Sequence, residues 1–220
     1  MNIFSVFDPC SYFGISLNWM ILMIVYIYIP VKYYLLESSM IKFFKNFYFQ
    51  VSKMFKEMSI PNHLALSFLS VMVFMYLMIS NLLSLFPFVF TSMGHPMITM
   101  GFGVILWLSF FLMGVFKNFK ESCAHLVPSG SPLILSPLMV MIESISHLIR
   151  PFTLSIRLAA NMMAGHLIVG LLSSISLLSV FGLMGSLFLQ NILLILEFSV
   201  AVIQGFVFSI LLLLYALEYY

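Results

Sequence analysis

Residues 155–161 read Ser-Ile-Arg-Leu-Ala-Ala-Asn, and the arginine in this stretch, Arg157, constrains the organisation of the whole chain. The sequence around it is apolar, and the next formally charged residue towards the C-terminus is Glu197. A guanidinium group keeps its charge in proteins. Placing one at the centre of a lipid bilayer costs roughly 2.5–3.5 kcal/mol on insertion scales. Arg157 therefore predicts a cavity or a partner inside a membrane that needs a permanent positive charge.

The composition agrees with a membrane location. Of the 220 residues 63% are hydrophobic and 7% are charged, whereas soluble domains carry about 25% charged residues. Uncharged runs extend over residues 9–31, 64–94, 96–116 and 198–217, each near or above the ~20 residues that a helix needs to cross a bilayer. The runs are continuous rather than alternating, which favours helices over a barrel. We therefore expect an all-α integral membrane protein.

Several function classes are excluded by what the sequence lacks. The net charge of +2 is too small to indicate nucleic-acid binding. Cys10 and Cys123 lie far apart and form no metal-ligand or redox spacing, so we expect no metal and no cofactor. No nucleotide-binding loop of the G-x-x-x-x-G-K type is present. Asp8 precedes the first apolar run and no basic region opens the chain, so we expect no cleavable signal and synthesis in the compartment whose membrane it enters.

The pattern predicts a single membrane domain over residues 1–220. A first span is expected over about 11–36, an interfacial helix over 41–58 and a helical hairpin over 63–116. Two long helices, over about 133–178 and 183–217, form a second hairpin and exceed a perpendicular span, which predicts strong tilt. Pro151 is expected to bend the first of them.

The segment 41–58 divides into two faces at helical spacing. Apolar residues lie on one side and lysines on the other, and only Phe49 departs from this division. Such a pattern suits a helix in the membrane interface; a solvated basic loop is the alternative. The lysines of residues 32–56 and of residues 117–120 predict that both loops lie on the synthesis side, with the N-terminus opposite.

Arg157 shares its helix face with small and polar residues. At about 100° per residue the same face carries Thr153, Ala160, Asn161, Ala164 and Ile168. Small residues let another helix approach closely, so this strip predicts a docking surface for a partner. The alternative is packing within the chain, with Arg157 paired to Glu143 or Glu197.

Other ionisable groups gather in the same hairpin. Glu197 and Gln204 share one helix face, as do Glu143 and His147. His166 lies nine residues beyond Arg157, about half a turn away around the helix. Chains of intramembrane acids and histidines commonly relay protons. His147 taken alone could equally be structural, but the whole set with an arginine predicts proton transport.

These residues resemble subunit a of the rotary ATP synthases, particularly the mitochondrial form. The resemblance covers most of the chain and is most specific between Glu143 and Gln204. The matching segments are 4–9 (Phe-Ser-Val-Phe-Asp-Pro), 142–146 (Ile-Glu-Ser-Ile-Ser), Arg150-Pro151, 156–162 (Ile-Arg-Leu-Ala-Ala-Asn-Met), Ala164-Gly165-His166, 196–198 (Leu-Glu-Phe) and Ile203-Gln204. Ala159 and Phe206 depart from the residues that are common in the family, threonine and tyrosine.

The resemblance implies a stator that faces a turning ring of carboxylate-bearing c subunits and provides two proton half-channels. Arg157 would be the essential charge at the ring interface. His166 and Glu197 would serve the half-channel from the intermembrane space and Glu143 the matrix-side exit, while Asn161 and Gln204 would be polar neighbours of Arg157. It further implies a multi-pass protein of the mitochondrial inner membrane with no catalytic site of its own, in contact with other membrane-sector and peripheral-stalk subunits.

Two other functions remain open from the residues alone. A secondary transporter or cation channel acting by itself often shows two related halves, which this sequence lacks. A structural subunit of a respiratory complex explains the hydrophobicity but not the clustered ionisable groups.

Overall fold

The computed structural model describes residues 7–9, 16–28, 36, 38–59, 64–86, 89–117, 120, 127, 135–176 and 180–218. These residues form helices and turns and include no strand. Four helices among them are long and apolar enough to cross a membrane: α3 (Leu64–Ser84), α4 (Pro96–Lys117), α6 (Ser136–Ser176) and α7 (Val180–Glu218). The expected all-α membrane fold is confirmed.

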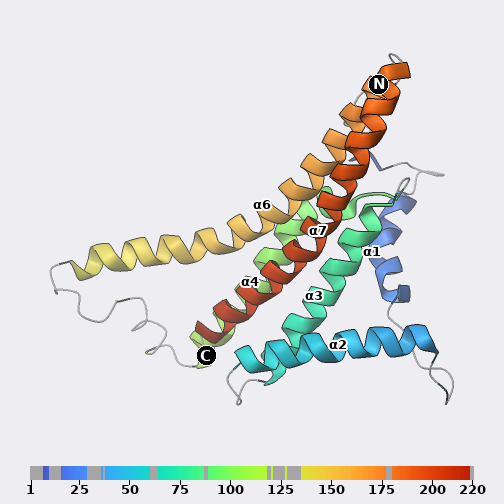
Figure 1. Ribbon diagram of the computed structural model, residues 1–220. Coiled ribbons are helices and arrows are strands. Elements are labelled where there is room, and N and C mark those ends of the chain that lie inside the picture. Colours follow the sequence, from blue (N-terminus) through green and yellow to red (C-terminus); the bar gives the residue numbers. More distant parts are fainter. Residues whose placement is uncertain are drawn as a thin grey trace.

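The two longest helices form the hairpin that the sequence predicts. α6 has 41 residues and α7 has 39, and at 1.5 Å per residue α6 is about 60 Å long, twice the thickness of a hydrocarbon core. Pro151 lies inside α6. In Figure 1 the helix bends, so that its first half extends away from the bundle while its second half runs beside α7.

α3 and α4 form the bundle against which this hairpin packs. α3 contacts α7, and α4 contacts both α6 and α7. Glycine permits close approach at one of these contacts, because a Cβ at Gly103 of α4 would collide with the Ser155 hydroxyl of α6. The buried core includes Leu77, Met93, Leu154, Leu158, Phe208 and Leu212.

α3 also buries serines. The hydroxyl groups of Ser67, Ser70, Ser80 and Ser84 donate to backbone carbonyls one turn earlier. This satisfies each hydroxyl inside its own helix, so a small polar side chain can be buried against a neighbouring helix without an unpaired donor.

α2 (Ser39–Met58) lies where the amphipathic pattern predicts a helix, and it runs across α3 in Figure 1. The Ser38 hydroxyl caps its first turn by accepting from the Ile41 amide at 3.4 Å. Val51 and Phe55 are buried against α3 and α7.

The segment expected as the first span is described over residues 16–28. It contains three short helical pieces, η2 (Leu17–Met20), α1 (Ile21–Ile24) and η3 (Val25–Tyr28). Apart from Leu36, the rest of the expected span lies outside the described residues, as do Cys10, Cys123 and most of the polar loop expected after Lys117. The continuous span over 11–36 therefore stays a prediction.

Candidate proton path and ring-facing surface

The Arg157 strip lies on the outer surface of α6. Thr153, Arg157, Ala160, Asn161, Ala164 and Ile168 are all exposed. On the adjoining side of the helix, Leu154, Leu158 and Met162 are buried against the rest of the chain. Within the described part of the chain no carboxylate lies at ion-pair distance from Arg157. The internal pairing of Arg157 with Glu143 or Glu197, which the sequence left open, is therefore absent there.

Glu143 instead belongs to a polar cluster at the other end of α6. Its carboxylate lies 3.4 Å from Nε2 of His147 and 3.5 Å from the guanidinium of Arg150. The Arg150 guanidinium also stands over the ring of Tyr215, 5.1 Å from its centroid. These contacts connect the first half of α6 with the C-terminal end of α7, and a cation over an aromatic face contributes about 0.5–2 kcal/mol.

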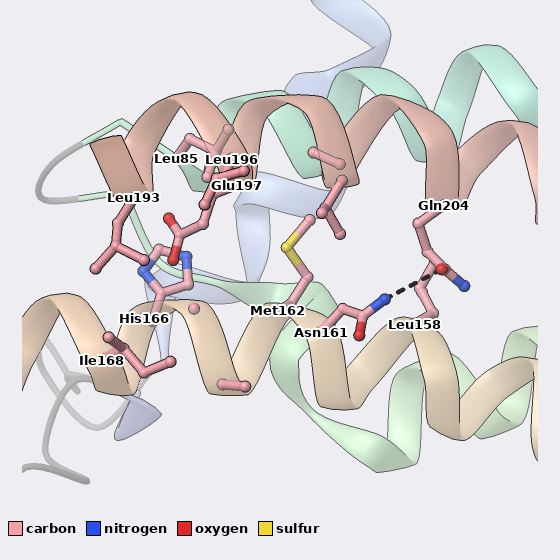
Figure 2. A pocket seen from close by; sticks show the side chains of 14 residues that line it. Leu85, Leu158, Asn161, Met162, His166, Ile168, Leu193, Leu196, Glu197 and Gln204 are labelled. Atoms are coloured by element: carbon pink, nitrogen blue, oxygen red, sulfur yellow. Dashed lines mark hydrogen bonds between the residues drawn. The ribbon is translucent and has the colours of Figure 1, made fainter. Parts of the chain in front are cut away.

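Asn161 and Gln204 are joined across the hairpin. The Asn161 side-chain amide donates to Oε1 of Gln204 at 3.1 Å (Figure 2). The Nε2 atom of Gln204 is buried and has no hydrogen-bond partner among the described residues. The pair therefore leaves the buried Nε2 donor of Gln204 unpaired within the described part of the chain. Asn161 places this pair about one helical turn beyond Arg157.

His166 and Glu197 lie further along the hairpin on facing helices. Both line a cavity of about 200 Å³ between α6 and α7, to which Leu85, next to the end of α3, also contributes (Figure 2). Asn161 and Gln204 line the same cavity. Three polar atoms of its lining residues, His166 Nε2, Glu197 Oε1 and Gln204 Nε2, are buried and have no hydrogen-bond partner in the described part. The cavity thus gathers four of the six residues selected from the sequence.

The structure brings four of the six residues together and places Glu143 in a separate polar region, with Arg157 between them. His166, Glu197, Asn161 and Gln204 meet at the cavity, whereas Glu143 lies 14 residues before Arg157 on α6, about 20 Å along a helix axis. Arg157 stands between the two groups and faces outward. Among the described residues no cluster of three or more His, Cys, Asp or Glu side chains could hold a metal ion.

Two further residues shape the cavity region, and the sequence reasoning assigned neither of them. A Cβ at Gly165 would overlap the Glu197 carboxyl group, so glycine leaves the space that this side chain occupies. Asn81 of α3 is fully buried and donates to the Ala201 carbonyl at 3.3 Å, while its Oδ1 atom has no partner in the described part. Both are uncharged, and the signal in the sequence that marks them is an amide or a glycine within an apolar helix.

Comparisons with known proteins identify the family. The model of the family described as ATP synthase A chain matches residues 13–216. A protein of Aedes aegypti named ATP synthase subunit a is 42% identical over 221 residues, covering 99% of this chain and 98% of its own length. Proteins of the same name from Anopheles gambiae and Drosophila yakuba are 41% and 40% identical, with the same coverage. The chain therefore belongs to the ATP synthase A chain family, the proton-translocating subunits of the ATP synthase membrane sector, which carry no catalytic site of their own.

Proposed function

We propose that this chain is the stator against which a ring of carboxylate-bearing c subunits turns in the mitochondrial inner membrane. The observation that carries the proposal is Arg157, which is exposed on a strip of small residues and has no carboxylate partner within the described part of the chain. A permanent cation in lipid needs an anion. A ring carboxylate that passes Arg157 supplies one at each step.

The two polar regions on either side of Arg157 would each belong to one proton half-channel. One leads from the intermembrane space through the cavity with His166 and Glu197, and the other leads from Glu143 to the matrix. A cavity of about 200 Å³ has room for several water molecules. Water there can supply partners to the buried atoms of His166, Glu197 and Gln204. Protons then pass along water and side chains in steps.

Arg157 has two effects in this mechanism. Its charge favours the ionised form of the ring carboxylate in front of it, and it repels a proton that would pass directly from one half-channel to the other. A proton therefore crosses only by riding on the ring. One charge that falls through 100 mV releases about 2.3 kcal/mol, which drives the rotation.

Membership of the family sets aside the two other functions that the residues left open, a transporter acting alone and a non-transporting structural subunit. The further partners proposed are other membrane-sector and peripheral-stalk subunits and the lipid bilayer.

Substitution of the arginine tests the proposal. Arg157→Ala should abolish proton-driven ATP synthesis while the complex still assembles, because the anion-binding charge is lost from an exposed position. Ile156→Ala is the matched control, since it truncates the neighbouring exposed side chain without a change of charge. Normal ATP synthesis by an assembled Arg157→Ala complex would contradict the proposed mechanism.

A further inference from the structure

Phe49 interrupts the lysine face of α2. Lys42, Lys45, Lys53 and Lys56 are all exposed, and at about 100° per residue they fall within an arc of about 80°. Phe49 lies at the centre of this arc, seven residues from Lys42 and seven from Lys56, and its side chain is 68% exposed. We call these four lysines and Phe49 the lysine face.

The spacing of the lysines repeats. Lys42 and Lys45 are three residues apart, as are Lys53 and Lys56, and the two pairs are offset by 11 residues. That offset is about 16 Å along the helix and three full turns. The lysine face therefore presents two pairs of cations with an aromatic ring midway between them. Four lysines against one glutamate give α2 a formal charge of +3.

The opposite side of α2 fixes which way the lysine face points. The Phe55 ring lies 6.3 Å from that of Phe74 on α3 and 6.1 Å from that of Phe206 on α7. Phe74 is ten residues into α3 and Phe206 is twelve residues before the end of α7. α2 thus packs against the flanks of two membrane-spanning helices rather than across their ends. The lysine face is exposed and points away from these two helices.

We propose that the lysine face of α2 binds anionic phospholipids, with each lysine pair contacting lipid phosphate and Phe49 inserted among the acyl chains between them. Charge complementarity selects this occupant, because a lysine near an anionic membrane surface contributes attraction and a phenylalanine beside it favours the acyl boundary. Phe43 is 66% exposed as well, but it lies about 120° from Phe49 around the helix, outside the lysine face. This inference does not depend on the proposed proton path.

A tryptophan at the centre of the face provides the readout. The full-length chain carrying Phe49→Trp is reconstituted in phosphatidylcholine vesicles that contain a minor fraction of phosphatidylglycerol. Acyl-chain bromine, which quenches tryptophan fluorescence on contact, is placed on one lipid or on the other. The signal from the two native tryptophans is measured with the parent chain and subtracted. We expect stronger quenching per brominated lipid when the bromine is on phosphatidylglycerol.

Lysine substitutions then test the cause of the preference. Replacing all four lysines with glutamine in the Phe49→Trp chain should lower the preference for phosphatidylglycerol by roughly tenfold or more, since each lysine near an anionic surface contributes about 1 kcal/mol. Lys120→Gln, an exposed lysine outside α2, is the matched control and should leave the preference unchanged. Circular dichroism checks that all variants keep the same helix content.

Three results would overturn the inference. Equal quenching by the two brominated lipids removes the anionic preference. Absence of quenching by either lipid places Phe49 in water or against protein. If the preference for phosphatidylglycerol persists after all four lysines are replaced, the lipid preference belongs to another part of the chain. The first two results come from the Phe49→Trp chain alone and do not depend on the folding of the lysine variant.

Discussion

The backbone of Gly165 lies directly against the side chain of Glu197. A Cβ added at Gly165 would overlap a carboxyl oxygen of Glu197 and lie 2.7 Å from its carboxyl carbon. Gly165 precedes His166 on α6, so the same turn of helix presents the histidine to the cavity and leaves room for the carboxyl group. The absence of a side chain at Gly165 of α6 therefore leaves the space that the carboxyl group of Glu197, a proposed proton carrier on α7, occupies.

Gly165→Ala should slow proton-driven ATP synthesis by about tenfold or more, because a misplacement of 1 Å at a reacting group can cost up to 10²-fold in rate. The measurement is ATP synthesis by assembled complexes in sealed vesicles. Gly185→Ala on α7 is the matched control, since nothing lies within 4 Å of a Cβ there. Combining Gly165→Ala with Glu197→Asp, which is one methylene shorter, should recover part of the rate. Full activity of Gly165→Ala alone would show that the Glu197 position is not critical.

Glu197→Gln should reduce passive proton conduction through the membrane sector after the soluble catalytic part is removed. The amide has nearly the shape of the carboxyl group but cannot bind and release a proton at this step, so conduction should fall while assembly is kept. Ser199→Ala, an exposed position two residues away on the same helix, serves as the control. Unchanged conduction in Glu197→Gln would take this residue out of the path.

The Asn161–Gln204 hydrogen bond should appear as coupling between two substitutions. Asn161→Leu leaves the buried Gln204 amide without its partner, which costs about 1–3 kcal/mol, and Gln204→Leu leaves the exposed Asn161 amide without its partner at a smaller cost. The double variant removes both amides, so its loss of thermal stability in the assembled complex should be smaller than the sum of the single losses by about 0.5–3 kcal/mol. Strictly additive losses would mean that the two amides do not interact.

Much of the fold could be predicted from the sequence because membrane helices are determined by local patterns. A long uncharged run must form a helix to satisfy its backbone in lipid, which predicts α3, α4 and the second half of α7. The alternation of lysines with aromatic residues over 41–58 predicts α2. The bend in α6 follows from Pro151, which removes a backbone donor. The strip that contains Arg157 follows from helical spacing alone.

The contacts between helices could not be predicted in the same way. Asn161 and Gln204 are 43 residues apart, and their pairing depends on the register of the hairpin, which no local pattern specifies. The same register places Glu197 against Gly165. The contact of Glu143 with His147 is local and follows from their spacing of four residues on α6, whereas the contact of Glu143 with Arg150, seven residues along the same helix, was not predicted.

Disulfide cross-linking within the assembled complex tests the central claim most directly. In a chain whose Cys10 and Cys123 are replaced by serine, Ala160→Cys places a thiol on the exposed strip, one turn beyond Arg157. Phe68→Cys, exposed on α3, is the matched control. With a second cysteine beside the carboxylate of the ring subunit, mild oxidation should join the ring subunit to position 160 and not to position 68. Failure of position 160 to cross-link in an assembled complex, under conditions that oxidise other facing cysteine pairs, would contradict the account that Arg157 meets an anion carried by the ring.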